Sequence, residues 1–299
     1  MAHPYRRKLT MSDSGESLLM RLSDRLFYRP DRRDRGSPAD HSLRYEDVFF
    51  PAADGSRLHG WFLPAEADGA ARGTVLHLHG NAANITGHYE FVRWLPAAGY
   101  DVLTFDYRGY GRSEGRASRR GMVEDGAAAL DYLRGREDVD ASRVMVYGQS
   151  IGAAVAVVMA AERRDQIQGL VAEGGFSDYR KIARHHVMRN PLLTVLAWWV
   201  PLVIPRGADP IDSVGAISPV PVLFVHGTAD GVVPWRMSQA MYDRAGAPKE
   251  LWLIDEMGHY EVWEAQPEAA QTRLLAFFEL ALDCGSDLVG KEKGVRKKC

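Results

Sequence analysis

The sequence predicts an α/β domain in which a mostly parallel sheet carries helices on both faces. From residue 43 onward, short apolar and β-branched runs alternate with stretches that repeat apolar residues at helical spacing. This alternation is typical of parallel strands joined by helical crossovers, which bury the strands on both sides. A chain of 299 residues, 46% of them hydrophobic, is long enough to form one large core.

Eight strands are predicted, over residues 43–50, 58–63, 74–78, 102–105, 144–147, 170–172, 222–225 and 251–254. The first two are separated by PAADGS, a turn composition that favours an antiparallel hairpin. Helices are predicted over residues 86–98, 118–135, 151–163, 236–245 and 267–282. We expect the domain to span residues 41–283. Residues 1–40 are expected to be an N-terminal extension with one candidate amphipathic helix, and residues 284–299 a basic disordered tail.

One connection is much longer than the others. Almost fifty residues separate the strand that ends near Glu173 from the strand that begins at Val222, and residues 192–205 are the most apolar part of the chain. Loops of that length inside a domain often act as lids. We expect a short helical lid at about residues 176–215, with Trp198 and Trp199 lining an apolar substrate pocket. The alternative is a helix that only covers the edge of the sheet.

The most informative motif follows the fifth strand. Residues 144–157 read VMVYGQSIGAAVAV, so Gly148-Gln149-Ser150-Ile151-Gly152 connects a strand directly to an alanine-rich helix. A serine on such a turn has strained backbone angles, and glycines are needed where side chains would collide with the backbone. A second Gly-x-Ser-x-Gly, at residues 111–115, follows a glycine-rich stretch and leads into a charged one. We therefore predict Ser150 as the nucleophile and Ser113 as a loop residue.

A serine hydroxyl needs a general base, and the base needs an acid to orient it. His259 follows the last predicted strand, and Asp230 follows the seventh. The resulting chain order of Ser150, Asp230 and His259 is the order found in enzymes with this strand-to-helix serine. Glu173, at the end of the sixth strand, is the alternative acid.

The oxyanion of a tetrahedral intermediate needs two preorganised donors. One is expected to be the N–H of Ile151, and the other the N–H of Asn81 in the loop after the third strand, with Ala82 as the alternative. His79 is expected to hold that loop by hydrogen bonds. It shares a strand face with His77, but no carboxylate lies at a suitable spacing, so no metal site is predicted.

Five motifs follow one another along the chain: residues 79–81 (HGN), 106–113 (DYRGYGRS), 148–152 (GQSIG), 226–230 (HGTAD) and 258–259 (GH). With them, residues 43–282 resemble the serine-aminopeptidase-like branch of the α/β-hydrolases, which includes single-domain hydrolases related to protein depalmitoylases. The resemblance implies the α/β-hydrolase fold, with an eight-stranded, mostly parallel sheet. It also implies a hydrolase without a cofactor, which forms an acyl-enzyme on Ser150 and uses His259 as base and then as acid.

The expected partner is a small acyl ester or thioester, or less favourably an amide, since an alcohol or thiol leaves more easily than an amine. The alternatives are an acyltransferase that uses the same acyl-enzyme and a non-catalytic binding protein on a hydrolase scaffold. A net charge of −2 gives no electrostatic basis for binding nucleic acid. No run reaches the ~18 apolar residues of a membrane span, which predicts a cytoplasmic protein. Peripheral membrane contact through residues 17–29 or the lid stays open. Cys284 and Cys299 are expected to be unpaired thiols.

Overall fold

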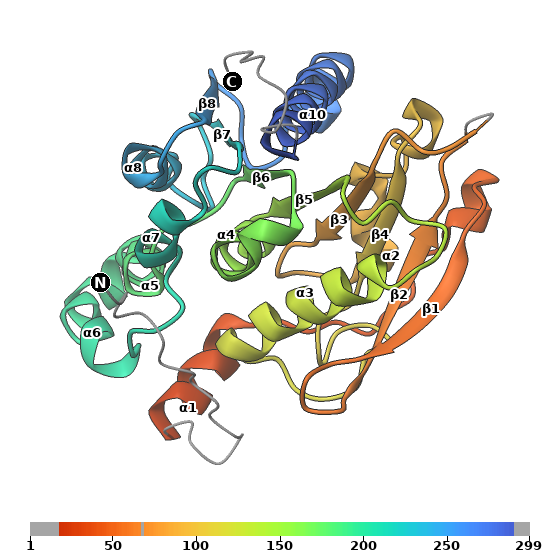
Figure 1. Cartoon of the computed structure of the whole chain (residues 1–299). Helices are drawn as coiled ribbons and strands as arrows, with labels where there is room; N and C mark the ends of the chain where they lie inside the picture. The colour runs from red at the N-terminus through yellow and green to blue at the C-terminus, as the bar shows by residue number, and fades with distance from the viewer. Residues whose placement is uncertain (1–17, 67–68, 290–299) are drawn as a thin grey trace, which may run out of the picture.

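The computed structural model describes residues 18–66 and 69–289, in which eight strands form one sheet with helices on both faces (Figure 1). The strand order is β1-β2-β4-β3-β5-β6-β7-β8. β2 runs antiparallel to β1 and β4, and every other neighbouring pair is parallel. The predicted strands and the hairpin are confirmed, with small shifts at their ends. The strands are β1 (Glu46–Pro51), β2 (Arg57–Leu63), β3 (Thr74–Leu78), β4 (Asp101–Phe105), β5 (Val144–Gln149), β6 (Gly169–Glu173), β7 (Val222–Gly227) and β8 (Lys249–Ile254).

Two of the predicted helices differ from the structure. The single helix expected over residues 86–98 is instead α2 and two short 3₁₀ turns, and the second turn begins at Pro96, which cannot donate a backbone hydrogen bond. The last helix continues past residue 282, so residues 284–289 are helical and do not belong to a tail. The helices are α1 (Leu18–Phe27), α2 (Ile85–His88), α3 (Arg119–Arg134), α4 (Ile151–Arg163), α5 (Tyr179–Met188), α6 (Val200–Val203), α7 (Pro210–Ser213), α8 (Arg236–Arg244), α9 (Val262–Ala265) and α10 (Pro267–Val289). The 3₁₀ helices are η2 (Pro38–His41), η3 (Tyr89–Phe91), η4 (Pro96–Ala98), η5 (Arg164–Gln166), η6 (Pro191–Trp198) and η7 (Val214–Ala216).

Two further expectations concern the ends of the chain. Cys284 is disulfide-bonded, so the expectation of an unpaired thiol at this position is wrong. The rest of the predicted tail, residues 290–299, and residues 1–17 of the predicted extension lie outside the described residues. Within the described ranges, no helix is both long and apolar enough to cross a membrane.

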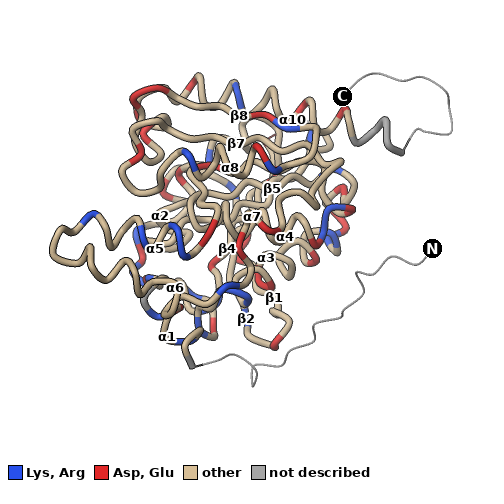
Figure 2. Tube along the Cα trace, turned by 90° about the vertical axis from the view of Figure 1, so that its left-hand side faces the viewer, with Lys and Arg blue, Asp and Glu red and all other residues tan. Residues whose placement is uncertain are grey.

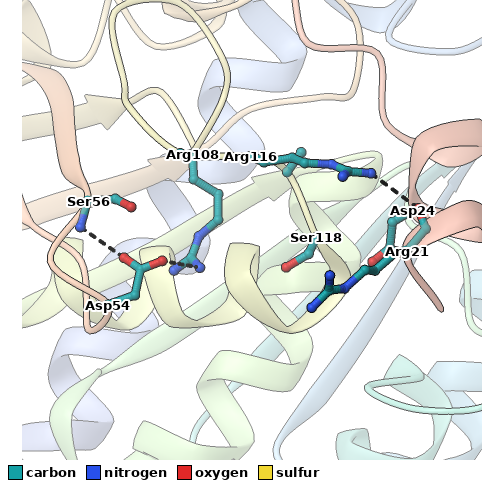
Figure 3. Close-up of a pocket in the computed structure, with 9 residues that line it drawn as sticks. Arg21, Asp24, Asp54, Ser56, Arg108, Arg116 and Ser118 are labelled. Atoms are coloured by element: carbon teal, nitrogen blue, oxygen red, sulfur yellow. Dashed lines mark hydrogen bonds and ion pairs between the residues drawn. The ribbon is translucent and has the colours of Figure 1, made fainter. Parts of the chain in front are cut away.

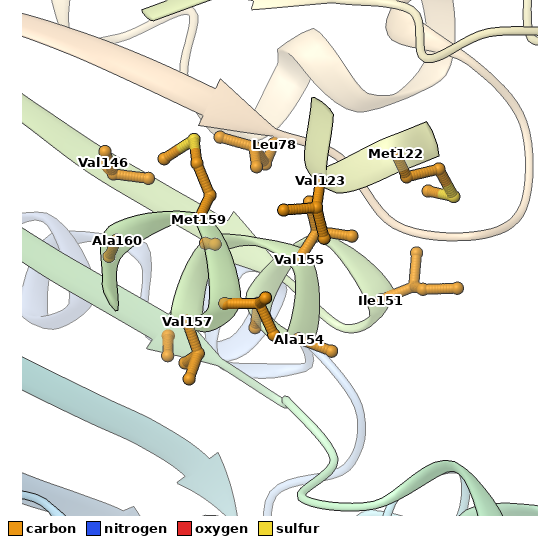
Figure 4. Packing of buried hydrophobic residues seen from close by; sticks show 14 of the residues in the cluster. Leu78, Met122, Val123, Val146, Ile151, Ala154, Val155, Val157, Met159 and Ala160 are labelled. Carbon is orange, nitrogen blue, oxygen red and sulfur yellow. The ribbon is translucent and has the colours of Figure 1, made fainter. Parts of the chain in front are cut away.

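The sheet separates two hydrophobic clusters, and β5 contributes to both. Val144 and Val146 lie in the cluster beneath α3 and α4, whereas Met145 and Tyr147 lie in the cluster beneath α10. The first ten residues of α4, from Ile151 onward, are all buried, as expected of a helix that is apolar on every side. Figure 4 shows α4 packed between the sheet and α3. This packing holds the start of α4 rigidly against the end of β5.

The N-terminal segment packs on the domain. Phe27, at the end of α1, makes an edge-to-face contact with Tyr179 of α5, with ring centroids 5.1 Å apart. The side-chain amide of Asn81 donates to the carbonyl of Phe27 at 2.7 Å, and that of Asn84 donates to the carbonyl of Arg33 at 2.9 Å. The predicted amphipathic helix is therefore present, and it is attached to the loop that follows β3.

Candidate active site

The turn between β5 and α4 has the geometry that its sequence predicts. Ser150 has φ +53° and ψ −114°, a conformation that side-chain-bearing residues rarely adopt. A Cβ added to Gly152 would lie 2.0 Å from the carbonyl oxygen of Leu78, and one added to Gly148 would lie 2.5 Å from the carbonyl oxygen of Gly152. Both glycines are therefore required by backbone packing. The turn leaves Ser150 half-exposed at the N-terminus of α4.

The predicted acid and base meet above the neighbouring strands. Asp230 follows β7 and His259 follows β8, and His259 Nδ1 lies 2.6 Å from Asp230 Oδ2. The other carboxylate oxygen, Oδ1, accepts hydrogen bonds from the N–H groups of Val232 and Val233. Burial alone raises the pKa of Asp230, but hydrogen bonds from His226 and His259 outweigh it and hold the pKa well below its usual value. An ionised Asp230 only accepts, so His259 carries its proton on Nδ1.

The carboxylate of the alternative acid, Glu173, accepts hydrogen bonds from residues other than His259. Its carboxylate accepts from the hydroxyl of Tyr147, from Gln149 Nε2 at 2.8 Å and from Trp263 Nε1 at 2.9 Å. Burial raises the pKa of Glu173 in spite of these three hydrogen bonds. Of the two candidate acids, only Asp230 is hydrogen-bonded to His259 among the described residues.

Tyr260 is a residue of this site that the sequence analysis missed. Its ring lies over the neighbouring imidazole of His259, with centroids 4.0 Å apart. Burial raises the pKa of Tyr260 well above its usual value, the charge of Glu173 raises it further, and the hydroxyl of Ser150 lowers it. No hydrogen bond joins the Ser150 hydroxyl to His259 in the described part of the chain. The Tyr260 hydroxyl is itself buried and has no hydrogen-bond partner among the described residues. The only signal in the sequence is the position of Tyr260 directly after His259.

The loop after β3 begins beside the turn that carries Ser150, because Leu78 pairs with Gly148 across β3 and β5. The N–H of Ile151 lies in the first turn of α4, where a helix offers no internal acceptor. The N–H of Asn81 likewise has no acceptor among the described residues. The Asn81 side chain holds the loop, since its Oδ1 accepts from the Tyr110 hydroxyl at 2.8 Å. His79 Nδ1 contacts the carbonyl of Gly80 at 2.7 Å, the structural role expected of it.

The second Gly-x-Ser-x-Gly is a loop, as predicted. The hydroxyl of Ser113 is buried, donates to the carbonyl of Asp106 at 2.6 Å and accepts from the N–H of His59 at 2.9 Å. It therefore supports a turn between β4 and α3.

Trp198 and Trp199, predicted to line a substrate pocket, lie at exposed positions. They are 77% and 60% exposed, so neither is enclosed by a cavity in this structure. Neither one lines the small cavity beside Asp230 and Tyr260. The larger cavity, of about 370 Å³, lies elsewhere, between α1 and the start of α3 (Figure 3). Its charged lining includes Arg21 and Arg108.

The comparisons with known proteins agree with this architecture. Residues 69–213 match the family model described as serine aminopeptidase, S33. The uncharacterized protein YfhR of Escherichia coli K12 is 35% identical, over 82% of this chain and 83% of its own length. The α/β hydrolase domain-containing protein WAV2 of Arabidopsis thaliana is 32% identical, over 89% of this chain and 90% of its own length.

The chain belongs to the α/β-hydrolase superfamily. A solved structure of the Pyrococcus furiosus esterase Pf2001 is similar to this hydrolase, with a TM-score of 0.71 and 25% identity, over 84% of this chain and 97% of that one. The predicted α/β-hydrolase fold is therefore confirmed, and the chain is an enzyme of the serine-hydrolase type.

Proposed function

We propose that this hydrolase cleaves carboxylic esters or thioesters through an acyl-enzyme on Ser150, with Asp230 and His259 as the other members of a catalytic triad. The observation that carries the proposal is the 2.6 Å contact between His259 Nδ1 and Asp230 Oδ2. With the proton held on Nδ1, the imidazole keeps Nε2 free to accept the proton of a serine hydroxyl.

The reaction then proceeds in two halves. Ser150 Oγ attacks the acyl carbon while His259 Nε2 takes the hydroxyl proton, and the tetrahedral oxyanion accepts from the N–H groups of Asn81 and Ile151. The bond to the leaving oxygen or sulfur breaks as His259 returns the proton to it. Water, deprotonated by His259, next attacks the acyl-enzyme and releases the acid and Ser150.

The proposal requires the hydroxyl of Ser150 to turn toward His259. A rotation about the Cα–Cβ bond of a serine is a small change, and hydrogen bonds of this kind often tighten only when substrate is bound. Esters and thioesters are favoured as substrates because an alcohol or thiol leaves more easily than an amine. The similarity to the Pf2001 esterase supports the same choice.

The test is hydrolysis of p-nitrophenyl esters of increasing acyl length, and of an acyl thioester with detection of the free thiol. Three proteins are compared: the unsubstituted chain, Ser150→Ala, and Ser113→Ala as the control from the second motif. We expect Ser150→Ala to lower kcat by about 10³-fold or more and Ser113→Ala to keep its turnover per folded molecule. A fluorophosphonate probe should label Ser150 alone. Full turnover by Ser150→Ala, or labelling at another serine, would refute the proposal.

A further inference from the structure

The insert between β6 and β7 exposes an unusual amount of apolar surface. Among the described residues, nine of the fourteen large hydrophobic side chains that are exposed lie within residues 188–203, which we name the 188–203 surface. The most exposed are Leu192 (88%), Trp198 (77%), Val195 (68%) and Leu202 (67%). Contiguous apolar patches of this kind on a protein mark a surface that binds something.

The contacts between the insert and the rest of the domain account for this exposure. Within residues 188–205 the buried residues are Ala197, Val200 and Ile204, while both tryptophans between them point outward. Arg119, at the start of α3, donates to the carbonyls of Pro205 and Gly207 at 2.9 and 3.2 Å. These contacts hold the C-terminal end of the insert to the domain with its indoles in solvent.

The first helix lies against the end of the insert and also exposes apolar side chains. A Cβ added to Gly207 would lie 3.7 Å from the terminal methyl of Met20, which places α1 against the end of the insert. On α1, Leu19 and Leu22 are 52% and 45% exposed. Two segments that are far apart in the sequence thus present apolar side chains at one end of the molecule.

The segment that carries this surface is positively charged. Residues 179–207 contain no Asp or Glu and carry five cations, Arg180, Lys181, Arg184, Arg189 and Arg206. The whole chain has a net charge of −2, so the remainder of the molecule is acidic. Figure 2 shows Lys and Arg positions on the tube around α1, α5 and α6. The surface is therefore a basic, apolar end on an acidic protein.

The pairing of indoles with guanidinium groups suits one kind of partner. Arg184 lies over the ring of Trp198, with its guanidinium carbon 5.6 Å from the ring centroid. Tryptophan favours the boundary between lipid headgroups and acyl chains, and each Lys or Arg near an anionic bilayer contributes attraction. A second copy of this chain would bring the same cations against each other, which opposes self-association.

We propose that the 188–203 surface, together with α1, docks this protein on the surface of an anionic phospholipid bilayer. The docking face adjoins the candidate acid, because Arg189 donates to the carbonyl of Gly231 next to Asp230. Docking does not depend on the hydrolase activity, so binding and turnover are measured separately.

The experiment is co-sedimentation of the full chain with vesicles of phosphatidylcholine alone and of phosphatidylcholine mixed with phosphatidylserine. We expect binding to the mixed vesicles that weakens as salt is added. The double variant Trp198→Ser/Trp199→Ser removes two exposed side chains and should lower the partition coefficient by about tenfold or more. Lys181→Glu/Arg206→Glu should weaken binding to the mixed vesicles. Leu280→Ser, at an exposed apolar position on α10, is the matched control and should bind like the unsubstituted chain.

Three results would overturn the proposal. One is that the full chain does not sediment with the mixed vesicles, and a second is that it sediments equally well after the tryptophan substitutions. The third result is that the free chain is an oligomer by analytical ultracentrifugation and becomes a monomer in Trp198→Ser/Trp199→Ser, since the surface would then be an interface between copies. Far-UV circular dichroism and thermal unfolding of each variant establish that the fold is intact, as substitutions at exposed positions predict.

Discussion

Substitution of Gly152 by alanine tests the packing that holds the nucleophile. The added methyl carbon would lie 2.0 Å from the carbonyl oxygen of Leu78 and 2.6 Å from that of His79. Both contacts are with backbone, at the end of β3 and the start of the loop that carries Asn81, so no side chain can turn away. A tolerable contact requires α4 and β3 to separate by about 1 Å.

The magnitude follows from two separate effects. Overpacking in a dense core costs about 1–3 kcal/mol, which for a domain of this size lowers Tm by roughly 2–4 °C for each kcal/mol. The same displacement separates the Ser150 hydroxyl from the N–H of Asn81, and a shift of about 1 Å in a reacting group can lower the rate by 10²-fold. We therefore expect Gly152→Ala to lower both Tm and kcat for a p-nitrophenyl ester.

Gly135→Ala is the matched control, because its added carbon would lie 3.5 Å from the carbonyl oxygen of Asp131, an ordinary contact, in a helical backbone conformation. It should change Tm by no more than about 2 °C, since it lies at the end of α3 away from the site. Thermal unfolding by circular dichroism and initial rates of ester hydrolysis give the two readouts. The reasoning is refuted if Gly152→Ala matches Gly135→Ala in both.

Two other predictions concern ionisable groups. Asp230→Asn should lower kcat by roughly 10³–10⁴-fold with the fold intact, because the amide cannot hold the proton of His259 on Nδ1. The kcat of Glu173→Gln should stay within about tenfold of that of the unsubstituted chain. The opposite ranking in steady-state assays would assign the acid to Glu173. Burial lowers the pKa of His77 to about 3, against about 6.5 in the unfolded chain, so the unfolded chain binds an extra proton between these pH values. His77 therefore contributes full stability above about pH 6.5 and loses it as the pH falls, by about 1.4 kcal/mol per pH unit. The free energy of unfolding, measured with urea at several pH values, should fall less steeply with decreasing pH in His77→Gln than in the unsubstituted chain. An equal slope in the two proteins would contradict this assignment.

Much of the fold and of the site could be predicted from local sequence. The eight strands are apolar runs between turn residues, and such runs predict strands that are buried on both faces of the sheet. Ser150 could be predicted because the turn admits only glycine at positions 148 and 152, a requirement of backbone packing that is visible in five residues. Asp230 and His259 could be predicted because each follows a strand, and the carboxyl ends of parallel strands meet at one edge.

Other features depend on contacts between distant residues and left no local signal. Glu173 accepts hydrogen bonds from Tyr147, Gln149 and Trp263, whereas Asp230 is hydrogen-bonded to His259, and this difference could not be read from the sequence near either carboxylate.

The sequence alone determined that this chain is an α/β enzyme with a strained serine, since that information is carried by hydrophobic periodicity and by glycines beside one residue. Only the tertiary structure decided where the apolar insert would point. A run of leucine and tryptophan is compatible with a pocket wall or with an exposed surface. The reason is that hydropathy indicates that a side chain favours burial but does not indicate which neighbour buries it. In this fold Ala197, Val200 and Ile204 are buried against the domain, and Trp198 and Trp199 face solvent.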